Sequence, residues 1–119
     1  MKKIRSVFKL PEAKQLLTPY WRTKNEQSNI ASTGFCYIAT EALFHMIGGI
    51  NSEYRPCYIK EDNETHWWLV NGKNHVLDPT FDQYEFVVPP YHLGKKAGFL
   101  NGYSKPSKRA AKILLLVSS

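Results

Sequence analysis

Residues 65–79 constrain the fold of this chain more than any other stretch of its sequence. Residues 65–70 are rich in aromatic and β-branched side chains, a composition that favours a β-strand. The Asn-Gly-Lys sequence at 71–73 is a strong signal for a hairpin turn, residues 75–78 can return as a second strand, and Pro79 ends that strand. The stretch therefore predicts an antiparallel hairpin.

The length of the turn decides which residues of the two strands face each other. A three-residue turn at 71–73 places His66 opposite Asp78, on the same face and about 4.5–5.5 Å apart at Cβ. In that arrangement Asp78 accepts a hydrogen bond from Nδ1 of His66. A two-residue turn at 72–73 instead places Asp78 opposite Trp67 and separates the two side chains, unless a bulge intervenes.

The clearest helix is expected at residues 34–47. Residues 32–34 offer a candidate N-cap, Gly48 and Gly49 end the helix, and the apolar side chains between them form one broad face. Cys36 falls in the first turn of this helix. Backbone N–H groups at that position favour a thiolate, and the same groups can stabilise an oxyanion on an attacked carbonyl.

The rest of the chain adds shorter elements. A strand is expected over residues 54–60, a further strand over 84–88 and a last helix over 106–116. Residues 1–30 are poorly patterned, apart from one or two helical turns that begin at Pro11.

Together these elements predict a single α+β domain, in which a helix that carries the cysteine packs on a small antiparallel sheet. Its expected parts are an irregular N-terminal segment at 1–30, a core at 32–88 and a basic C-terminal segment with a helix at 89–119. The length of 119 residues fits one domain and suffices for one hydrophobic core.

The positive charge of the chain is concentrated in one segment. The formal net charge is +6, and residues 1–85 hold ten basic and ten acidic side chains, which cancel. Residues 86–119 hold six basic side chains and no acidic one. Such a segment attracts phosphates, nucleic acid or an acidic protein surface, although it can equally serve as a solubilising surface.

Two cysteines, Cys36 and Cys57, occur in a chain without a visible signal peptide, so reduced thiols and a cytoplasmic location are expected. The longest apolar run, residues 113–117, is too short to span a membrane. Neither a C-x₂-C nor an H-x₃₋₅-H spacing occurs, so no metal and no other cofactor is expected.

Three residues in the expected helix and hairpin suggest a catalytic centre. A thiolate is a nucleophile, a histidine can take and return a proton, and a carboxylate can orient the histidine. The sequence therefore predicts a triad of Cys36, His66 and Asp78. A structural alternative stays open, because a free cysteine is most often a small buried hydrophobe. Cys57 and His45 are expected to be structural.

The motifs around these residues resemble those of the papain-like and transglutaminase-like cysteine hydrolases. The Gly-Phe-Cys-Tyr sequence at 34–37 is similar to the small-x-Cys-aromatic pattern around papain-like nucleophiles. Residues 66–80, with a histidine, an aromatic strand, a turn and Asp-Pro-Thr, look like the transglutaminase-like core signature. The resemblance covers residues 32–82. It implies that fold, and it assigns the nucleophile, the base and the orienting carboxylate to the same three residues.

The chain departs from these families in two ways. It is short, so the substrate-binding lobe is minimal or missing. Papain-like enzymes carry an oxyanion glutamine several residues before the cysteine, and here the candidates are Gln27 and Asn29, at a spacing that does not match well. The stretches at 98–100 and 106–110 resemble segments of small phage-encoded proteins; a viral origin would place the protein in the host cytoplasm, and this likeness implies no activity.

The first hypothesis is a thiol-dependent hydrolase or acyl transferase that acts on an amide, ester or thioester of a protein, peptide or small acyl substrate. The candidate substrate contacts are the aromatic side chains Tyr37 and Trp67, the polar side chains Gln27 and Asn29, and, for an acidic or phosphate-bearing group, Lys105, Lys108 and Arg109. One alternative is a non-enzymatic module that binds nucleic acid or protein through the basic C-terminal segment. Another is a hydrolase fold that has lost its activity and serves as an inhibitor or interaction protein.

Overall fold

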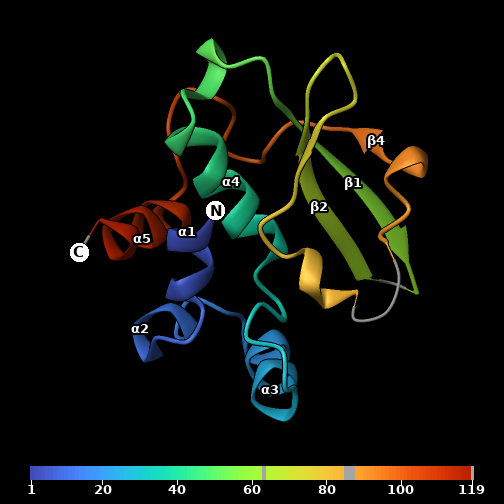
Figure 1. Cartoon of the computed structure of the whole chain (residues 1–119). Helices are drawn as coiled ribbons and strands as arrows, with labels where there is room; N and C mark the ends of the chain where they lie inside the picture. The colour runs from blue at the N-terminus through green and yellow to red at the C-terminus, as the bar shows by residue number, and fades with distance from the viewer. Residues whose placement is uncertain (63, 85–87, 119) are drawn as a thin grey trace.

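A four-stranded antiparallel sheet lies beside five α-helices in the computed structural model, which describes residues 1–62, 64–84 and 88–118 (Figure 1). The helices of this part of the chain are α1 (Lys2–Val7), α2 (Pro11–Lys14), α3 (Pro19–Gln27), α4 (Cys36–Met46) and α5 (Lys108–Val117). Its strands are β1 (Arg55–Glu61), β2 (Glu64–Val70), β3 (Val76–Leu77) and β4 (Lys95–Lys96). Its short 3-10 helices are η1 (Gly49–Asn51), η2 (Phe81–Gln83) and η3 (Tyr91–Leu93). The α+β class predicted from the sequence is confirmed.

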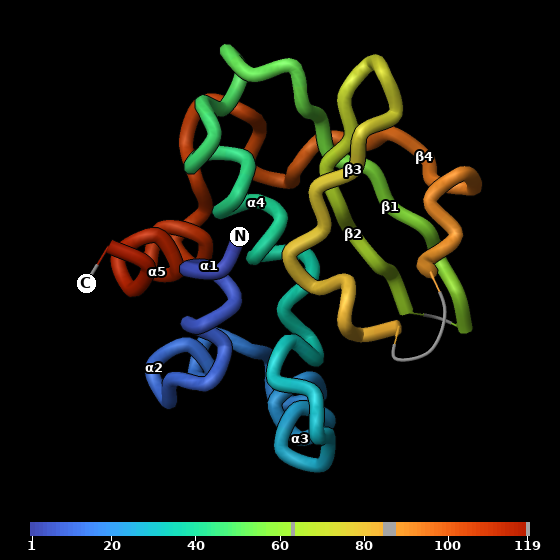
Figure 2. Tube along the Cα trace, in the orientation of Figure 1, coloured from blue at the N-terminus to red at the C-terminus, as the bar shows by residue number. Residues whose placement is uncertain are grey.

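α4 runs through the centre of the molecule, with α1 and α5 on one side and the sheet on the other (Figures 1 and 2). Eight of its eleven residues are buried, because a helix that is apolar on most sides has to be covered on several of them. Phe35, just before α4, stacks on Phe8, just after α1, with ring centroids 4.8 Å apart. The hydrophobic core therefore lies mainly among these helices, and β2 contributes Leu69 to it.

The sheet has the strand order β3-β2-β1-β4, and the pairing of β2 with β3 differs from both predicted registers. Val70 pairs with Val76, so the connection spans the five residues 71–75. The side chain of Asn71 explains the longer loop, because its Oδ1 accepts hydrogen bonds from two backbone N–H groups within the loop (3.0 and 2.9 Å). The predicted three-residue turn is therefore wrong.

The shifted register still leaves His66 and Asp78 on one face of the sheet. A shift of two residues keeps every side chain on its face, since side chains along a strand alternate with period two. Asp78 follows β3 directly, and a continued register would place it opposite Trp68 rather than His66. The two side chains therefore approach each other diagonally.

Residues 1–30 are largely helical, which corrects the prediction of an irregular segment. Pro11, as predicted, and Pro19 each occupy the first turn of a helix, where a proline removes no intrahelical hydrogen bond. The helices α1, α2 and α3 are only four to nine residues long, so the sequence shows hardly any apolar period. α1 is held in place by the burial of Ile4 and Val7 in the core.

α5 begins later than predicted, because Ser107 caps it and Pro106 precedes the cap. The Ser107 hydroxyl accepts a hydrogen bond from the backbone N–H of Ala110 (3.2 Å). The same hydroxyl donates to Oε1 of Glu41 in α4 (2.7 Å), and the Ser107 backbone N–H donates to Oε2 (2.6 Å). The buried Glu41 carboxylate thus supplies negative charge at the positive end of α5 and ties that helix to α4.

α4 is the helix predicted at 34–47, although its N-cap is Phe35 rather than a residue of 32–34. β1 is the strand predicted at 54–60 and is displaced by one residue. The strand predicted at 84–88 lies largely outside the described residues. Within those residues, no helix is long and apolar enough to cross a membrane.

Candidate active site

α4 covers the free edge of β2 and brings the cysteine to it. β3 pairs with the last two residues of β2, and the earlier part of this edge has no strand partner among the residues that the structure describes. Side chains of α4 take its place: Thr40 Oγ1 donates to the carbonyl oxygen of Trp67 (3.1 Å), and one turn earlier the Cys36 thiol donates to that of Thr65 (3.3 Å). The docked helix therefore holds Cys36 beside the part of β2 that carries His66.

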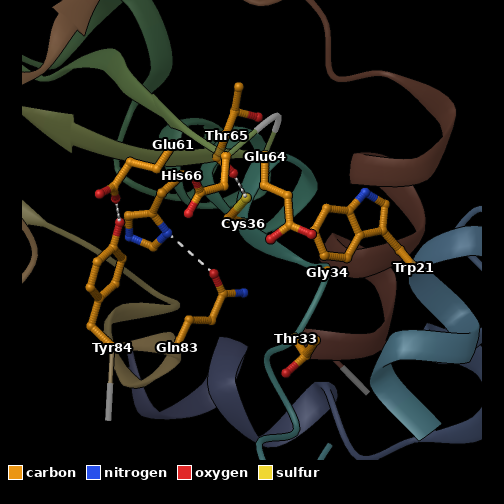
Figure 3. A pocket seen from close by; sticks show the side chains of 11 residues that line it. Trp21, Thr33, Gly34, Cys36, Glu61, Glu64, Thr65, His66, Gln83 and Tyr84 are labelled. Carbon is orange, nitrogen blue, oxygen red and sulfur yellow. Dashed lines mark hydrogen bonds between the residues drawn. The ribbon is translucent and has the colours of Figure 1, made fainter. Parts of the chain in front are cut away.

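His66 is held at both of its ring nitrogens. Nε2 donates to Oδ2 of Asp78 at 2.7 Å. Nδ1 lies 3.2 Å from Oε1 of Gln83 (Figure 3). The residue is only 5% exposed. The predicted contact between His66 and Asp78 is confirmed, but the predicted ring atom is wrong. The carboxylate binds Nε2, and Nδ1 instead contacts Gln83, which lines a cavity together with Cys36.

The Asp78 carboxylate accepts hydrogen bonds from four donors. Its Oδ2 accepts from His66 and from the hydroxyl of Tyr91 (2.8 Å). Its Oδ1 accepts from the backbone N–H (3.0 Å) and the hydroxyl (3.4 Å) of Thr80. Asp78 is only 3% exposed, and a buried carboxylate stays ionised at low cost only when donors replace its water. The network therefore fixes the carboxylate that orients His66.

Gln83 determines where the second proton of the ring lies. Its Nε2 donates to the backbone carbonyl of Ser32 (2.6 Å), which turns its Oε1 toward Nδ1 of His66. An amide oxygen only accepts, so this contact requires a proton on Nδ1. Both ring nitrogens then donate, and the hydrogen-bond network is satisfied by an imidazolium beside Cys36.

The surroundings of His66 favour the same charged form. Burial of the ring lowers its pKa, because burial disfavours a charge, but hydrogen bonds and charge interactions with Asp78 and Cys36 outweigh burial and raise the pKa to about 9. The protonated ring is therefore the main form at neutral pH. Such a ring can give a proton to a leaving group.

Trp68 and Tyr91 support the imidazole through ring packing. The ring centroids of Trp68 and His66 are 5.8 Å apart, and those of Trp68 and Tyr91 are 5.1 Å apart. Gly94 permits this packing, since a Cβ at that position would lie 2.3 Å from the Trp68 ring and 2.6 Å from Sγ of Cys57. Cys57 is buried in the sheet, as predicted, and burial raises its pKa.

Two cavities meet at Cys36. The first, of about 330 Å³, also contains His66, Gln83 and the carboxylates of the turn between β1 and β2 (Figure 3). The second, of about 320 Å³, does not reach His66. It is lined by three of the side chains that the sequence predicts as substrate contacts: Tyr37, Trp67 and Arg109. A substrate bound across both cavities would pass directly over the thiol.

Trp21 and Gly34 border both cavities. Gly34 has φ +86°, and a Cβ there would lie 3.0 Å from Cβ of Trp21, so a glycine lets the chain turn into α4 against the indole. α3, which carries Trp21, is tied to the start of β2 by an ion pair of Lys24 with Glu64 (2.6 Å). α3 therefore forms part of the site, a role that its weak sequence pattern does not reveal.

Four of the predicted substrate contacts lie outside both cavities. Gln27, Asn29, Lys105 and Lys108 are exposed, and none of them lines either cavity. The two cavities therefore lend no support to the predicted roles of these four residues. In particular, neither Gln27 nor Asn29 is placed to serve as an oxyanion glutamine.

Two residues that contact the His66–Asp78 pair are missed by sequence reasoning. Gln83 ends the 3-10 helix η2, and Tyr91 begins η3. Both lie in irregular segments without a periodic pattern, so no local signal marks them.

The basic C-terminal segment does not form one patch. Lys95 and Lys96 lie on β4 at the outer edge of the sheet, whereas Lys108, Arg109 and Lys112 lie on α5 at the opposite side of the molecule (Figure 1). Of these five side chains, Arg109 borders the second cavity. A divided charge offers a nucleic-acid strand no continuous surface and does not favour that alternative.

The chemistry of this site is identified neither by a group of metal-binding side chains among the described residues nor by a known relative. Among the described residues, no three His, Cys, Asp or Glu side chains are grouped in a way that could hold a metal ion. No model of a known protein family, no curated protein and no solved structure matches the chain. The function has to be inferred from the geometry around Cys36.

Proposed function

We propose that the protein is a thiol-dependent hydrolase or acyl transferase that attacks an amide, ester or thioester carbonyl through Cys36, His66 and Asp78. One observation carries this proposal: Asp78 holds His66 at Nε2, while His66 and Cys36 line the same cavity. A nucleophile beside a base that is oriented by a third group is the general arrangement for nucleophilic catalysis. The resemblance of the surrounding motifs to papain-like and transglutaminase-like enzymes supports the same chemistry.

Before the acylation step, the Cys36 thiol, which donates to Thr65 in the structure, gives its proton to solvent, because both ring nitrogens of His66 already carry one. The thiolate then forms a bond to the carbonyl carbon, and the carbonyl electron pair moves onto oxygen. The first N–H groups of α4 have no partner within the helix, so they can donate to this oxyanion. Collapse of the intermediate restores the carbonyl and breaks the bond to the leaving group, which takes the proton from Nδ1 of His66. The products are a thioester on Cys36 and a neutral imidazole.

In the second step, water or an amine attacks the thioester and gives its proton to Nδ1 of His66. The bond to sulfur breaks, and Cys36 leaves as a thiolate beside the imidazolium. Asp78 stays ionised throughout and stabilises the charged ring. Hydrolysis is the simpler outcome, since water needs no second binding site. The free thiols of Cys36 and Cys57 fit a reducing compartment such as the cytoplasm.

Iodoacetamide is expected to label Cys36 at least about ten times faster than Cys57 at pH 7. Cys36 is 9% exposed, borders two cavities and shares one of them with His66, whereas Cys57 is 4% exposed, lines neither cavity, and burial raises its pKa. Mass spectrometry of peptides after timed quenching measures both rates in one sample.

The matched variants are His66→Gln and His92→Gln. The first should slow the labelling of Cys36, and the second, at an exposed position of η3, should leave the rate unchanged. Slow and equal labelling of Cys36 and Cys57 in the unmodified protein would overturn the proposed function.

His66 is expected to make the folded protein less stable as the pH rises from 7 to 10. The pKa of His66 rises from its ordinary value of 6.5 to about 9 on folding. The resulting stabilisation is fully present below about pH 6.5 and is lost as the pH rises through the folded-state value. It amounts to something on the order of 3 kcal/mol.

Urea unfolding of the unmodified protein and of His66→Gln at a series of pH values measures this contribution. The difference between the two unfolding free energies isolates His66, because all other titrating groups are shared. A difference that stays constant from pH 6 to 10 would show that folding does not raise the pKa of His66.

A further inference from the structure

We propose that the two cavities receive opposite halves of the substrate. The acyl half, which carries an apolar group and an anion, lies against Trp67 and Arg109. The leaving half, which carries a positive charge, lies against Glu61, Asp62 and Glu64. This inference rests on the proposed function and names the substrate class of the same site. The substrate is an amide with an acidic group on its acyl side and an amine or a basic residue on its leaving side.

The position of His66 sets the direction in which the substrate lies. A general acid must reach the leaving group, so the leaving half lies on the side of Cys36 that His66 faces. His66 lines the first cavity and not the second. The acyl half stays attached to sulfur and extends the other way, into the cavity that shares Cys36 but not the imidazole.

The first cavity carries carboxylates and no lysine or arginine in its described lining. Glu61, Asp62 and Glu64 all come from the turn between β1 and β2 or its flanks (Figure 3 labels the two glutamates). Lys24, which lies outside the lining, pairs with Glu64, and the Tyr84 hydroxyl donates to Glu61. Lys24 offsets one of these three negative charges, and the charge of the His66 ring is balanced by its partner Asp78. The remaining field of the cavity therefore attracts a positively charged leaving group.

The second cavity has the opposite character. Trp67 and Tyr37 meet edge to face, with ring centroids 5.0 Å apart, and give it an apolar wall. Nε of Arg109 donates to the backbone carbonyl of Leu16 (2.7 Å), which anchors the guanidinium and leaves its terminal nitrogens to bind a carboxylate or phosphate. No acidic side chain lines this cavity within the described residues. An acyl half with an apolar group next to an anion fits it best.

Peptidyl chloromethyl ketones test the second cavity through the labelling of Cys36. Their peptide lies on the acyl side, and the thiolate displaces chloride to form a thioether. The probe acetyl-Glu-Phe-chloromethyl ketone is expected to react about ten times faster than its Lys-Phe counterpart. Arg109→Gln should abolish this preference. Lys108→Gln removes the neighbouring charge outside both cavities and should preserve it.

Chloroacetyl-lysine amide and chloroacetyl-glutamate amide test the first cavity in the same way. The lysine probe is expected to react several times faster, by about fivefold or more. Asp62→Asn should reduce this preference, and asparagine accepts the φ of +50° at that position. Glu26→Gln, at an exposed position of α3, and Arg109→Gln should both preserve it.

The outcomes separate this inference from the proposed function. Paired probes that react equally, or with the reversed preference, would overturn the inference if neutral iodoacetamide still labels Cys36 faster than Cys57. A lysine preference that is lost in Arg109→Gln and kept in Asp62→Asn would overturn the assignment of the halves to the cavities. Slow, equal labelling of both thiols by iodoacetamide would overturn the proposed function itself.

Discussion

In an Asp78→Asn variant, Cys36 is expected to react with iodoacetamide about ten times more slowly than in the unmodified protein. The variant is also expected to lose about 3 kcal/mol of unfolding free energy. The carboxylate of Asp78 accepts from four donors, two at each oxygen. An amide has one accepting oxygen, so its NH₂ group must face either His66 and Tyr91 or the two donors of Thr80. In either orientation, buried donors lose their partner.

The labelling rate and the urea unfolding curve report on the two consequences separately. Loss of the negative charge removes the main partner that favours the imidazolium of His66, which slows the reaction of the thiol. Tyr91→Phe is the graded control, because it removes one donor and leaves the bond from His66, at a cost of about 1 kcal/mol. An Asp78→Asn protein with unchanged labelling and stability would show that the carboxylate does not organise the site.

A Gly94→Ala variant is expected to lose about 3 kcal/mol of unfolding free energy, although it adds a single methyl group. The new Cβ would lie 2.3 Å from one atom of the Trp68 ring, 2.9 Å from another and 2.6 Å from Sγ of Cys57. Trp68 is completely buried and cannot move aside without displacing its neighbours. Because Trp68 packs on His66, the labelling of Cys36 should slow as well.

Gly72→Ala is the matched control for this change. A Cβ at Gly72 would meet no atom within 4 Å, so its stability should change by no more than about 0.5 kcal/mol. Chemical unfolding of both variants under the same conditions gives the comparison. Equal stability of Gly94→Ala and Gly72→Ala would mean that the sheet and the segment at Gly94 do not approach as closely as described.

The helix and the hairpin could be predicted because their signals are local in the sequence. The aromatic run of β2 and the glycines after α4 mark these elements without reference to the rest of the fold. The contact of His66 with Asp78 requires that both residues lie on one face of the sheet, at opposite or diagonally neighbouring positions. A register shift of two residues preserves that condition, so the contact survives an incorrect turn length.

The finer geometry could not be predicted, because it depends on contacts between distant segments. The turn is lengthened by an Asn71 side chain that folds back on the loop. The orientation of the imidazole is set by Gln83 and Tyr91, which belong to irregular segments. The walls of the cavities include Trp21 of α3, a helix that is held by polar contacts of Lys24 and Asn25 with other segments rather than by its own sequence pattern.

The bond between Glu41 and the start of α5 bears on how the protein matures during synthesis. The hairpin of β1 and β2 joins neighbouring stretches and can form early on the ribosome. Among the described residues, the Glu41 carboxylate in the middle of α4 gains its hydrogen bonds only when Ser107 has been made. The apolar face of α1 is covered only after α5 has been made. The helix that carries Cys36 therefore gains its hydrogen bonds to the start of α5 only after the hairpin of β1 and β2 has been made.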